Sequence, residues 1–306
     1  MENYTITRTP LRISFVGGSS DLPVYLNTGR EGAAVSATIN KYMRTSVADC
    51  KLGYKIDGKH YNSFINIPNE RIGECVFQMK TANVDIEVDS DVRQGSGLGA
   101  SSALVVGLLR SLFAHRQMDV PTEKLVYMAT EIEERLAGCG KQDVHGTATG
   151  GMKKLMFLSD GRVRILKFNT PVTNPFLLFD TGIKRPENII DSVVDVGKIA
   201  GQVALVSPFI VAMMKHDIYE IGRILHEGWR LKRGTAKRIS SYSIDIIYER
   251  ALAAGAIGGK VCGAGGGGFM LFCAEPERHQ AIVSELRDLT HVPFEFVDTG
   301  VEICKP

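Results

Sequence analysis

Apolar and polar residues alternate with a period of two in two short segments of the N-terminal half of the chain. The segments are residues 11–15 (LRISF) and residues 84–88 (VDIEV). Side chains of a strand point alternately to its two faces, so the pattern predicts two half-buried strands. Arg12 then lies on the polar face of the first strand, which we expect to end at Gly17 and Gly18.

A different spacing of apolar residues predicts helices. Residues 103–114 are almost continuously apolar, and residues 122–136 place an apolar stripe on one helix face. We expect Thr122 to cap the second of these helices and Gly138 to end it. Glu133 lies at the edge of the apolar stripe, so it is the glutamate of this helix that can face a site.

The pattern changes beyond residue 170, where longer helices are expected at 208–232 and 244–254. We therefore predict a domain boundary near this position, with one domain at 1–170 and a second at 171–306. Each part is long enough to bury a core of its own.

Composition narrows the class of protein. Of 306 residues, 44 % are hydrophobic and 23 % charged, with a net charge of +2, so we expect a globular protein without a nucleic-acid partner. The six cysteines include no Cys-x-x-Cys pair, which favours a reducing cytoplasm over a zinc site or a disulfide framework. No basic head with an apolar run is seen at the N-terminus and no apolar run of about 18 residues elsewhere, so neither export nor a membrane span is expected.

A run of small residues separates the 84–88 strand from the 103–114 helix. The run is Gly95, Ser96, Gly97, Leu98, Gly99, Ala100, Ser101 and Ser102. The first N–H groups of a helix have no intrahelical partner, and glycines let a ligand approach the backbone closely. The run therefore predicts a loop that binds the phosphates of a nucleotide, with a purely structural turn as the alternative.

Two other phosphate-binding loops do not fit the spacing. A Walker A loop requires a Gly-Lys-Ser/Thr ending, and residues 95–102 contain no lysine. A dinucleotide-binding loop would explain Gly95, Gly97 and Ala100, but it requires an acidic residue at the end of a second strand. The nearest acidic residue, Asp119, instead follows a helical segment.

Three segments together resemble the motifs of the GHMP kinases, in the order expected for that family. They are residues 10–21 (PLRISFVGGSSD), residues 95–102 and residues 260–268 (KVCGAGGGG). Within the family, the chain is most similar to the D-glycero-D-manno-heptose 7-phosphate kinases, because residues 37–42 (ATINKY) and 226–232 (HEGWRLK) also match.

The resemblance implies an α+β protein with the two-domain GHMP kinase fold. An N-terminal α/β domain would bind the nucleotide, a C-terminal ferredoxin-like domain would follow, and the active site would lie between them. The chain departs from galactokinases, which carry Glu-His in place of Gly18 and Ser19. It also departs from many relatives in having Arg93 and Gln94, with no proline, before Gly95.

The resemblance also implies catalytic roles. Asp143, in the family's Gly-x-x-Asp pattern, would accept the proton of the sugar hydroxyl, and Arg12 would keep this carboxylate ionised. Ser101 and Glu133 would bind Mg²⁺, since hydroxyl and carboxylate oxygens suit this hard cation. If the match to the family motif is shifted by one residue, Ser102 takes the place of Ser101 as the metal ligand.

The sugar would be held by Asp21, with Gly18 and Ser19 in the same turn. A phosphate on the sugar requires a basic anchor, and Lys184 and Arg185 are the first choice because they follow a turn. A second choice is the basic cluster of Arg230, Lys232, Arg233, Lys237 and Arg238. A supporting loop from the second domain would contain Gly263, Gly265, Gly266 and Gly267.

The implied activity is transfer of the γ-phosphate of ATP, with Mg²⁺, to the anomeric hydroxyl of a sugar. D-glycero-D-manno-heptose 7-phosphate, converted to the 1,7-bisphosphate, is the expected substrate. Two alternatives stay open: a kinase for L-fucose or another hexose, and a catalytically silent regulator that binds sugar and ATP. The adenine contacts, the anomer and a homodimeric state are left open as well.

Overall fold

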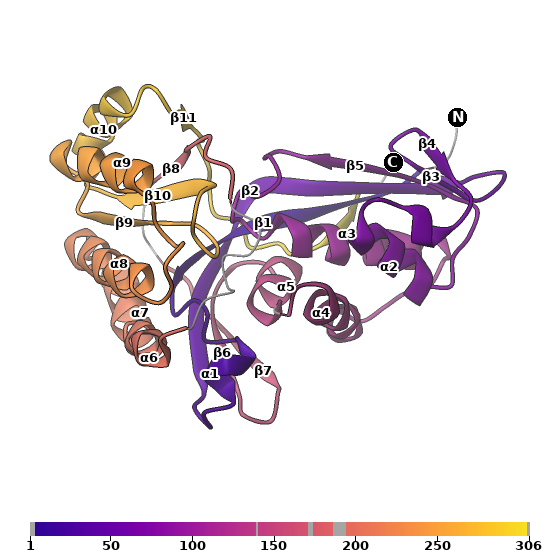
Figure 1. The fold of residues 1–306 in the computed structure, drawn as a ribbon, viewed down its shortest axis with the longest axis horizontal. Coiled ribbons are helices and arrows are strands. Elements are labelled where there is room, and N and C mark those ends of the chain that lie inside the picture. Colours follow the sequence, from indigo (N-terminus) through magenta and orange to yellow (C-terminus); the bar gives the residue numbers. More distant parts are fainter. Residues whose placement is uncertain (1–3, 139, 171–173, 186–193, 305–306) are drawn as a thin grey trace.

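The computed structural model describes residues 4–138, 140–170, 174–185 and 194–304. The described chain is built on two β-sheets (Figure 1). The right-hand part of Figure 1 is formed mainly by elements of the N-terminal half together with the C-terminal end of the chain, and the left-hand part by other elements of the C-terminal half.

Two long antiparallel strands, β1 (Thr5–Val16) and β2 (Gly32–Asp49), are the spine of the first sheet. One part of β2 pairs with β5 (Val84–Ser90) and the other part with β6 (Met152–Phe157). The predicted strands at 11–15 and 84–88 are therefore confirmed. The sheet also contains four short strands: β3 (Tyr54–Ile56), β4 (Lys59–Tyr61), β7 (Val163–Lys167) and β12 (Glu302–Cys304).

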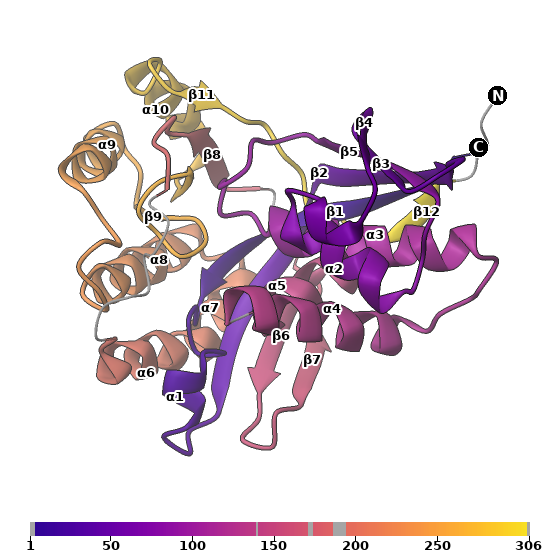
Figure 2. The ribbon, with the colours of Figure 1, turned by 45° about the vertical axis from the view of Figure 1, so that its right-hand side comes forward.

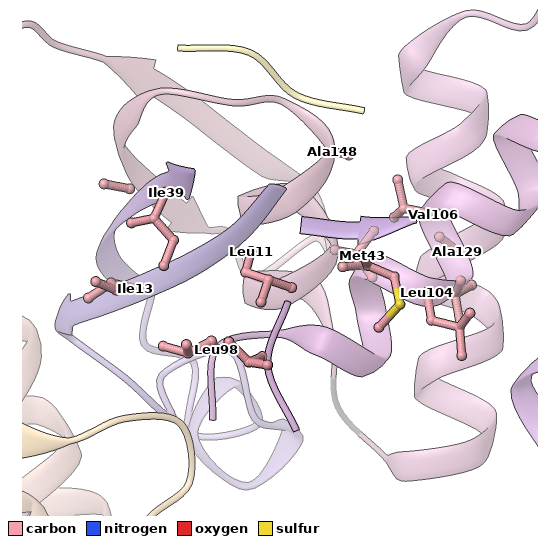
Figure 3. Close-up of a cluster of buried hydrophobic side chains, with 14 of the residues drawn as sticks. Leu11, Ile13, Ile39, Met43, Leu98, Leu104, Val106, Ala129 and Ala148 are labelled. Atoms are coloured by element: carbon pink, nitrogen blue, oxygen red, sulfur yellow. The ribbon is translucent and has the colours of Figure 1, made fainter. Parts of the chain in front are cut away.

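Helices of the N-terminal half lie along one face of this sheet (Figure 1). They are α2 (Glu70–Gln78), α3 (Ala100–His115), α4 (Thr122–Ala137) and α5 (Lys141–Ala148). The helix α3 packs on β1 and β2 and contacts α2, α4 and α5, which explains its almost continuous apolar run. Figure 3 shows side chains of β1, β2, α3 and α4 in one buried cluster, among them Leu11, Met43, Leu104 and Ala129.

The second sheet has the strand order β11-β8-β10-β9 and belongs to the C-terminal half. Its strands are β8 (Phe176–Asp180), β9 (Gly258–Val261), β10 (Phe269–Cys273) and β11 (Thr290–His291). Helix α8 (Ile218–Arg233) contacts β9 and β10, and α6 and α7 pack on α8. The other helical elements of the described chain are α1 (Pro23–Leu26), α6 (Val196–Ala204), α7 (Val206–Lys215), α9 (Tyr242–Ala253), α10 (His279–Glu285), η1 (Phe64–Asn66) and η2 (Pro276–Arg278).

Two local predictions need correction. The helix expected at 208–232 is two helices, because His216 ends α7 in the left-handed conformation (φ +58°) and the Asp217 side chain caps α8. Thr122 does not cap α4, since Pro121 occupies the cap position, whereas Gly138 ends α4 as expected. The polar face of β1 that carries Arg12 is covered by the protein, because the Arg12 side chain is only 2 % exposed.

The last strand of the described chain crosses back to the first sheet. β12 pairs antiparallel with β1, so residues 302–304 complete the sheet of the N-terminal half. The change from the first sheet to the second takes place between β7 and β8 along the chain. The boundary near residue 170 stays a prediction, and the return of β12 joins the two ends of the chain in one sheet.

One segment bears on the expectation that the chain has no membrane span. Val196–Lys215, which covers α6 and α7, has the length and the mean hydropathy, 1.6, of a spanning helix. Core helices of globular proteins share these properties. The two helices pack on α8 and β2, and Figure 2 shows α6, α7 and α8 side by side.

Candidate active site

An arginine and an aspartate from distant parts of the chain meet at the centre of the site. Arg12, on β1, donates to Asp143 Oδ1 from Nε at 3.0 Å and forms an ion pair through Nη2 at 2.6 Å. The Asp143 side chain, in the first turn of α5, is 32 % exposed. The buried arginine therefore fixes a carboxylate that keeps an accessible side, as a group that receives a proton from a ligand requires.

The same arginine also holds the glycine-rich loop that precedes α3. Its Nη1 donates to the Gly97 carbonyl at 2.7 Å, and its backbone N–H donates to the Leu98 carbonyl at 2.9 Å. Gly95, Gly97 and Gly99 all have φ between +75° and +80°, a region that glycine adopts without strain. Arg12 thus links the candidate phosphate loop to Asp143.

Two serines at the start of α3 have different environments. Ser101 is exposed, whereas Ser102 is 1 % exposed. Ser96 is also buried, and its carbonyl accepts a hydrogen bond from Phe269 N–H at 3.0 Å. Ser101 is therefore the hydroxyl of this turn that a ligand can reach, and Ala100 is the first residue of the helix.

The second glycine-rich loop, between β9 and β10, packs directly on the first. A Cβ atom at Gly97 would lie 2.3 Å from the Cys262 carbonyl oxygen, and one at Gly263 would lie 2.6 Å from the Gly97 Cα. Farther along, Gly265 approaches Ile239, and Gly267 approaches the Ile183 carbonyl. Gly266 donates its N–H to the Ile239 carbonyl at 2.8 Å. This loop is filled by the protein itself rather than left open.

A second carboxylate lies beside Asp143. Asp21 accepts a hydrogen bond from the backbone N–H of Gln142 at 3.1 Å, one residue before Asp143. The pKa of Asp21 is raised from 3.8 to about 6, chiefly by loss of water and further by the Asp143 charge, while the Gln142 hydrogen bond opposes the rise. Two carboxylates with Arg12 beside them give the site both proton acceptors and a compensating charge.

The turn that carries Asp21 is tightly built. Ser19 has φ +69°, an uncommon conformation for a residue other than glycine, and Gly18 has open space where a Cβ would point. Ser20 donates its hydroxyl to the Gly17 carbonyl at 2.7 Å. Gly18 is itself buried but has free space beside it, and Ser19 is partly exposed, in a turn that Ser20 holds in place.

Glu133, which the sequence places at the edge of the apolar stripe of α4, faces the protein interior. It is buried, and both carboxylate oxygens accept hydrogen bonds from Arg71, at 2.7 and 3.3 Å. The exposed Ser101 hydroxyl and the Glu133 carboxylate have the oxygen chemistry that Mg²⁺ prefers, so the residues fit this metal. Any metal on Glu133 would share its carboxylate with Arg71. Within the described ranges, no three or more His, Cys, Asp and Glu side chains gather into a further metal site.

The basic pair expected to anchor a substrate phosphate lies beside the second glycine loop. Lys184 is exposed and Arg185 is partly buried, and the Arg185 backbone N would lie 3.2 Å from a Cβ at Gly267. Just before them, Asp180 accepts three hydrogen bonds of 2.6–3.0 Å from Arg93, the residue that departs from the family pattern. This ion pair fastens the start of the first glycine loop to the segment that carries Lys184 and Arg185.

A buried lysine supports the helix that carries Asp143. Lys153, on β6, donates to the Gly146 carbonyl at 2.8 Å and to the Thr149 hydroxyl at 3.1 Å, near the C-terminal end of α5. Loss of water lowers the pKa of Lys153 to about 7. A donor at a helix C-terminus satisfies carbonyls that lack partners, so Lys153 stabilises the position of α5.

Sequence reasoning missed Arg71, Arg93, Asp180 and Lys153. Each acts through a partner that lies far away in the chain or in another element, and none belongs to a glycine-rich motif. The departure of Arg93 from the family pattern was the only signal available, and it did not point to Asp180.

Comparison with known proteins identifies the family. The GHMP kinases N terminal domain matches residues 67–151, and the GHMP kinases C terminal domain matches residues 209–290, together more than half of the chain. A Campylobacter jejuni protein named D-glycero-alpha-D-manno-heptose 7-phosphate kinase is 27 % identical, with 97 % of each chain covered. An Arabidopsis thaliana bifunctional fucokinase/GDP-fucose pyrophosphorylase is 23 % identical over 98 % of this chain but 32 % of its own length.

Solved structures have the same fold. The crystal structure of a D-glycero-D-manno-heptose 1-phosphate kinase from Bacteriodes thetaiotaomicron superposes with a TM-score of 0.81, at 26 % identity and 99 % coverage of both chains. A Streptococcus pneumoniae phosphomevalonate kinase in complex with phosphomevalonate and AMPPNP superposes with a TM-score of 0.79 at 15 % identity, covering 95 % of this chain and 99 % of its own. The predicted α+β, two-domain fold is confirmed, and the chain belongs to the GHMP kinase family.

Proposed function

We propose that this GHMP kinase transfers the γ-phosphate of ATP to the anomeric hydroxyl of D-glycero-D-manno-heptose 7-phosphate, forming the 1,7-bisphosphate. The observation that carries the proposal is the double contact of Arg12 with Asp143 and with Gly97. It joins a carboxylate that can receive a proton to a loop that can hold phosphates. The name of the Campylobacter jejuni relative supports heptose 7-phosphate as the acceptor.

In the proposed reaction, Asp143 accepts the proton of the sugar hydroxyl as its oxygen forms a bond to the γ-phosphorus of ATP. The bond between the γ-phosphorus and the β,γ-bridging oxygen breaks, and ADP leaves with that electron pair. The Arg12 guanidinium, fixed by Asp143 and Gly97, stabilises negative charge that develops on the transferred group. Backbone N–H groups at the start of α3 orient the phosphates of the nucleotide.

Ser101 and Glu133 would hold Mg²⁺, which offsets the charge of the β- and γ-phosphates when it is bound. Asp21, with Gly18 and Ser19, would bind hydroxyls of the sugar. The carboxylate of Asp21 accepts such hydrogen bonds in either protonation state, so its raised pKa is compatible with this role. Lys184 and Arg185 would contact the 7-phosphate.

The experiment that tests the function is a panel assay of ATP consumption. The purified protein is supplied with heptose 7-phosphate, L-fucose, galactose or mannose, and the Asp143→Asn variant serves as the inactive control. We expect turnover with heptose 7-phosphate to exceed the others. Turnover of L-fucose alone would assign the chain to the alternative hexose kinase activity, and no turnover with binding of ATP and a sugar would support a regulator.

A further inference from the structure

The described part of the chain buries three lysines with unequal sets of partners. Lys153 and Lys260 each donate to two oxygens: Lys153 to Gly146 and Thr149, and Lys260 to the carbonyls of Ser14 and Phe15. Each of these two lysines links separate elements and uses two of the three N–H donors of its amine. Lys232 differs from both.

Lys232 is 4 % exposed and lies in the last turn of α8. Its Nζ donates to one acceptor, the Gly263 carbonyl, although an ammonium group has three donors. It forms no ion pair within the part of the chain that the structure describes. A buried cation without a carboxylate partner is costly, so the position calls for an anion.

The surroundings of Lys232 add positive charge. The charged groups that act on it most strongly are the cations Lys260, Arg185 and Arg12, together with the Cys262 thiol, which is buried beside them. Burial, first of all, and these cations lower the pKa of Lys232 well below its ordinary value. Of these cations, Arg12 is paired with Asp143, and the other two, Lys260 and Arg185, belong to the C-terminal half.

The neighbouring basic residues of α8 have different partners. Arg230 pairs with Glu227, and Arg233 pairs with Asp245, both at exposed positions, whereas Lys237 and Arg238 are exposed. Lys232 alone among these five points inward, toward the Gly263 loop. The cluster is therefore one inward lysine and four surface residues.

We propose that Lys232 and Arg185 form the subsite that binds the phosphate group already carried by the sugar substrate. The proposal rests on the function proposed above and combines one residue from each of the two basic segments considered as anchors. Arg185 approaches from the segment beside Gly267 and is partly exposed, which gives the subsite its open side.

The subsite lies beside the candidate nucleotide loop but is built from the opposite half of the molecule. Gly263, which binds Lys232, lies against Gly97 of the first glycine loop, and Arg12 holds Gly97 from the other side. The amides at the start of α3 serve the phosphates of ATP, whereas Lys232 comes from the opposite half of the molecule. A sugar with its hydroxyl at Asp143 would then carry its own phosphate toward Lys232.

The test compares Lys232→Met, which removes the charge but keeps the length of the side chain, with Lys215→Met. Lys215 is a matched control because it is an exposed lysine in the last turn of the neighbouring helix α7. We expect Lys232→Met to raise the KM for heptose 7-phosphate about 10- to 100-fold, the range for a charge-assisted contact. The KM for ATP should stay within about threefold, and Lys215→Met should change neither.

A binding measurement separates the subsite from a structural role and from the choice of sugar. Inorganic phosphate should raise the melting temperature of the wild type but not of Lys232→Met, while ATP should raise both, which also shows that the variant is folded. The Arg185→Met variant should lose the phosphate response as well. If the wild type responds and Lys232→Met does not, but no heptose 7-phosphate is turned over, the subsite stands and the proposed substrate fails.

Two results would overturn the proposal. Equal losses for ATP and sugar phosphate in Lys232→Met would show that the lysine only holds the Gly263 loop. An unchanged phosphate response in both variants would move the anchor elsewhere, with Lys184 as the next residue to test. A rise in the KM for ATP alone would assign Lys232 to the nucleotide instead.

Discussion

The two glycine-rich loops of this kinase have similar compositions but different environments. In the first loop, Gly95 has no atom within 4 Å of where a Cβ would be, and the loop opens the helix α3. In the second loop, Gly263, Gly265 and Gly267 would each place a Cβ within 2.6–2.8 Å of neighbouring atoms. The first loop therefore leaves space for a ligand at Gly95 and packs on Cys262 only at Gly97, whereas all three of these glycines of the second loop face space that the protein itself fills.

The difference shows that glycine content alone does not identify a ligand loop. The element that follows the loop is the better guide, because a helix N-terminus presents unpaired N–H groups, whereas a strand pairs its N–H groups with a neighbouring strand. After the second loop, β10 pairs with β8 and β9. The second loop therefore contributes contacts and support for the first.

The largest expected effect is catalytic and tests whether the first loop lies beside the base. Asp143→Asn should lower kcat by about 10²–10⁴-fold, because general-base assistance is typically of this size, and should leave ATP binding nearly intact. Steady-state kinetics and an ATP binding titration measure the two effects. Asp119→Asn is the control, since the Asp119 side chain is 97 % exposed.

Arg12 provides a second step in the same test. Arg12→Met should also lower kcat, and the double variant should lose less than the product of the single losses, because both groups act on one transition state. A kcat of Asp143→Asn within about threefold of the wild type would contradict the assignment. Asp21 would then be the next carboxylate to test.

The next effect concerns the contact between the loops. Gly95→Ala and Gly97→Ala both place alanine at positive φ, which costs about 1–2 kcal/mol, but only Gly97→Ala meets a backbone oxygen at 2.3 Å. We expect Gly97→Ala to destabilise the protein by a further 1–3 kcal/mol or so, the usual range for overpacking. Denaturant unfolding of the matched pair measures the difference, and equal losses would show that the loops are free to separate.

A smaller effect distinguishes the two serines of the first loop. Ser101→Ala should raise the Mg²⁺ concentration for half-maximal activity by roughly tenfold, equivalent to one hydrogen bond or ligand contact, whereas the buried Ser102 should not act on the metal directly. Glu133→Gln should also raise the Mg²⁺ concentration for half-maximal activity, since it removes the negative charge of the carboxylate that Arg71 binds. Full activity in excess chelator, or a larger effect of Ser102→Ala, would argue against these ligands.

The smallest effect is on stability and follows from the pKa of Asp21. The pKa of this carboxyl is 3.8 in the unfolded chain and about 6 in the folded protein, so the native state keeps the proton up to a higher pH. The contribution of Asp21 to the stability of the wild type should therefore fall as pH rises from about 4 to 6 and level off above that. Asp21→Asn should lack this fall, so the melting temperature of the variant minus that of the wild type should increase as pH rises over this range. Parallel pH curves for the two proteins would show that Asp21 is not perturbed.

The sequence determined the elements that depend on local patterns. Period-two alternation predicted β1 and β5, and the apolar run predicted α3, because side-chain direction in a strand or helix follows from backbone geometry alone. The helix α4 and its end at Gly138 followed from the same local rules, and the family followed from three motifs. The break at His216 and Asp217 was missed because it contains neither the glycine nor the proline that commonly marks a helix end.

The tertiary structure decided how distant residues are joined. Arg12 and Asp143 are 131 positions apart, Arg71 and Glu133 are 62 apart, and Arg93 and Asp180 are 87 apart. Sequence patterns report which side of an element a residue occupies, but not which element covers that side. For this reason a polar position such as Arg12 or Glu133 proved to be buried against a charged partner, and Lys232 was separated from its surface neighbours only by its place in the fold.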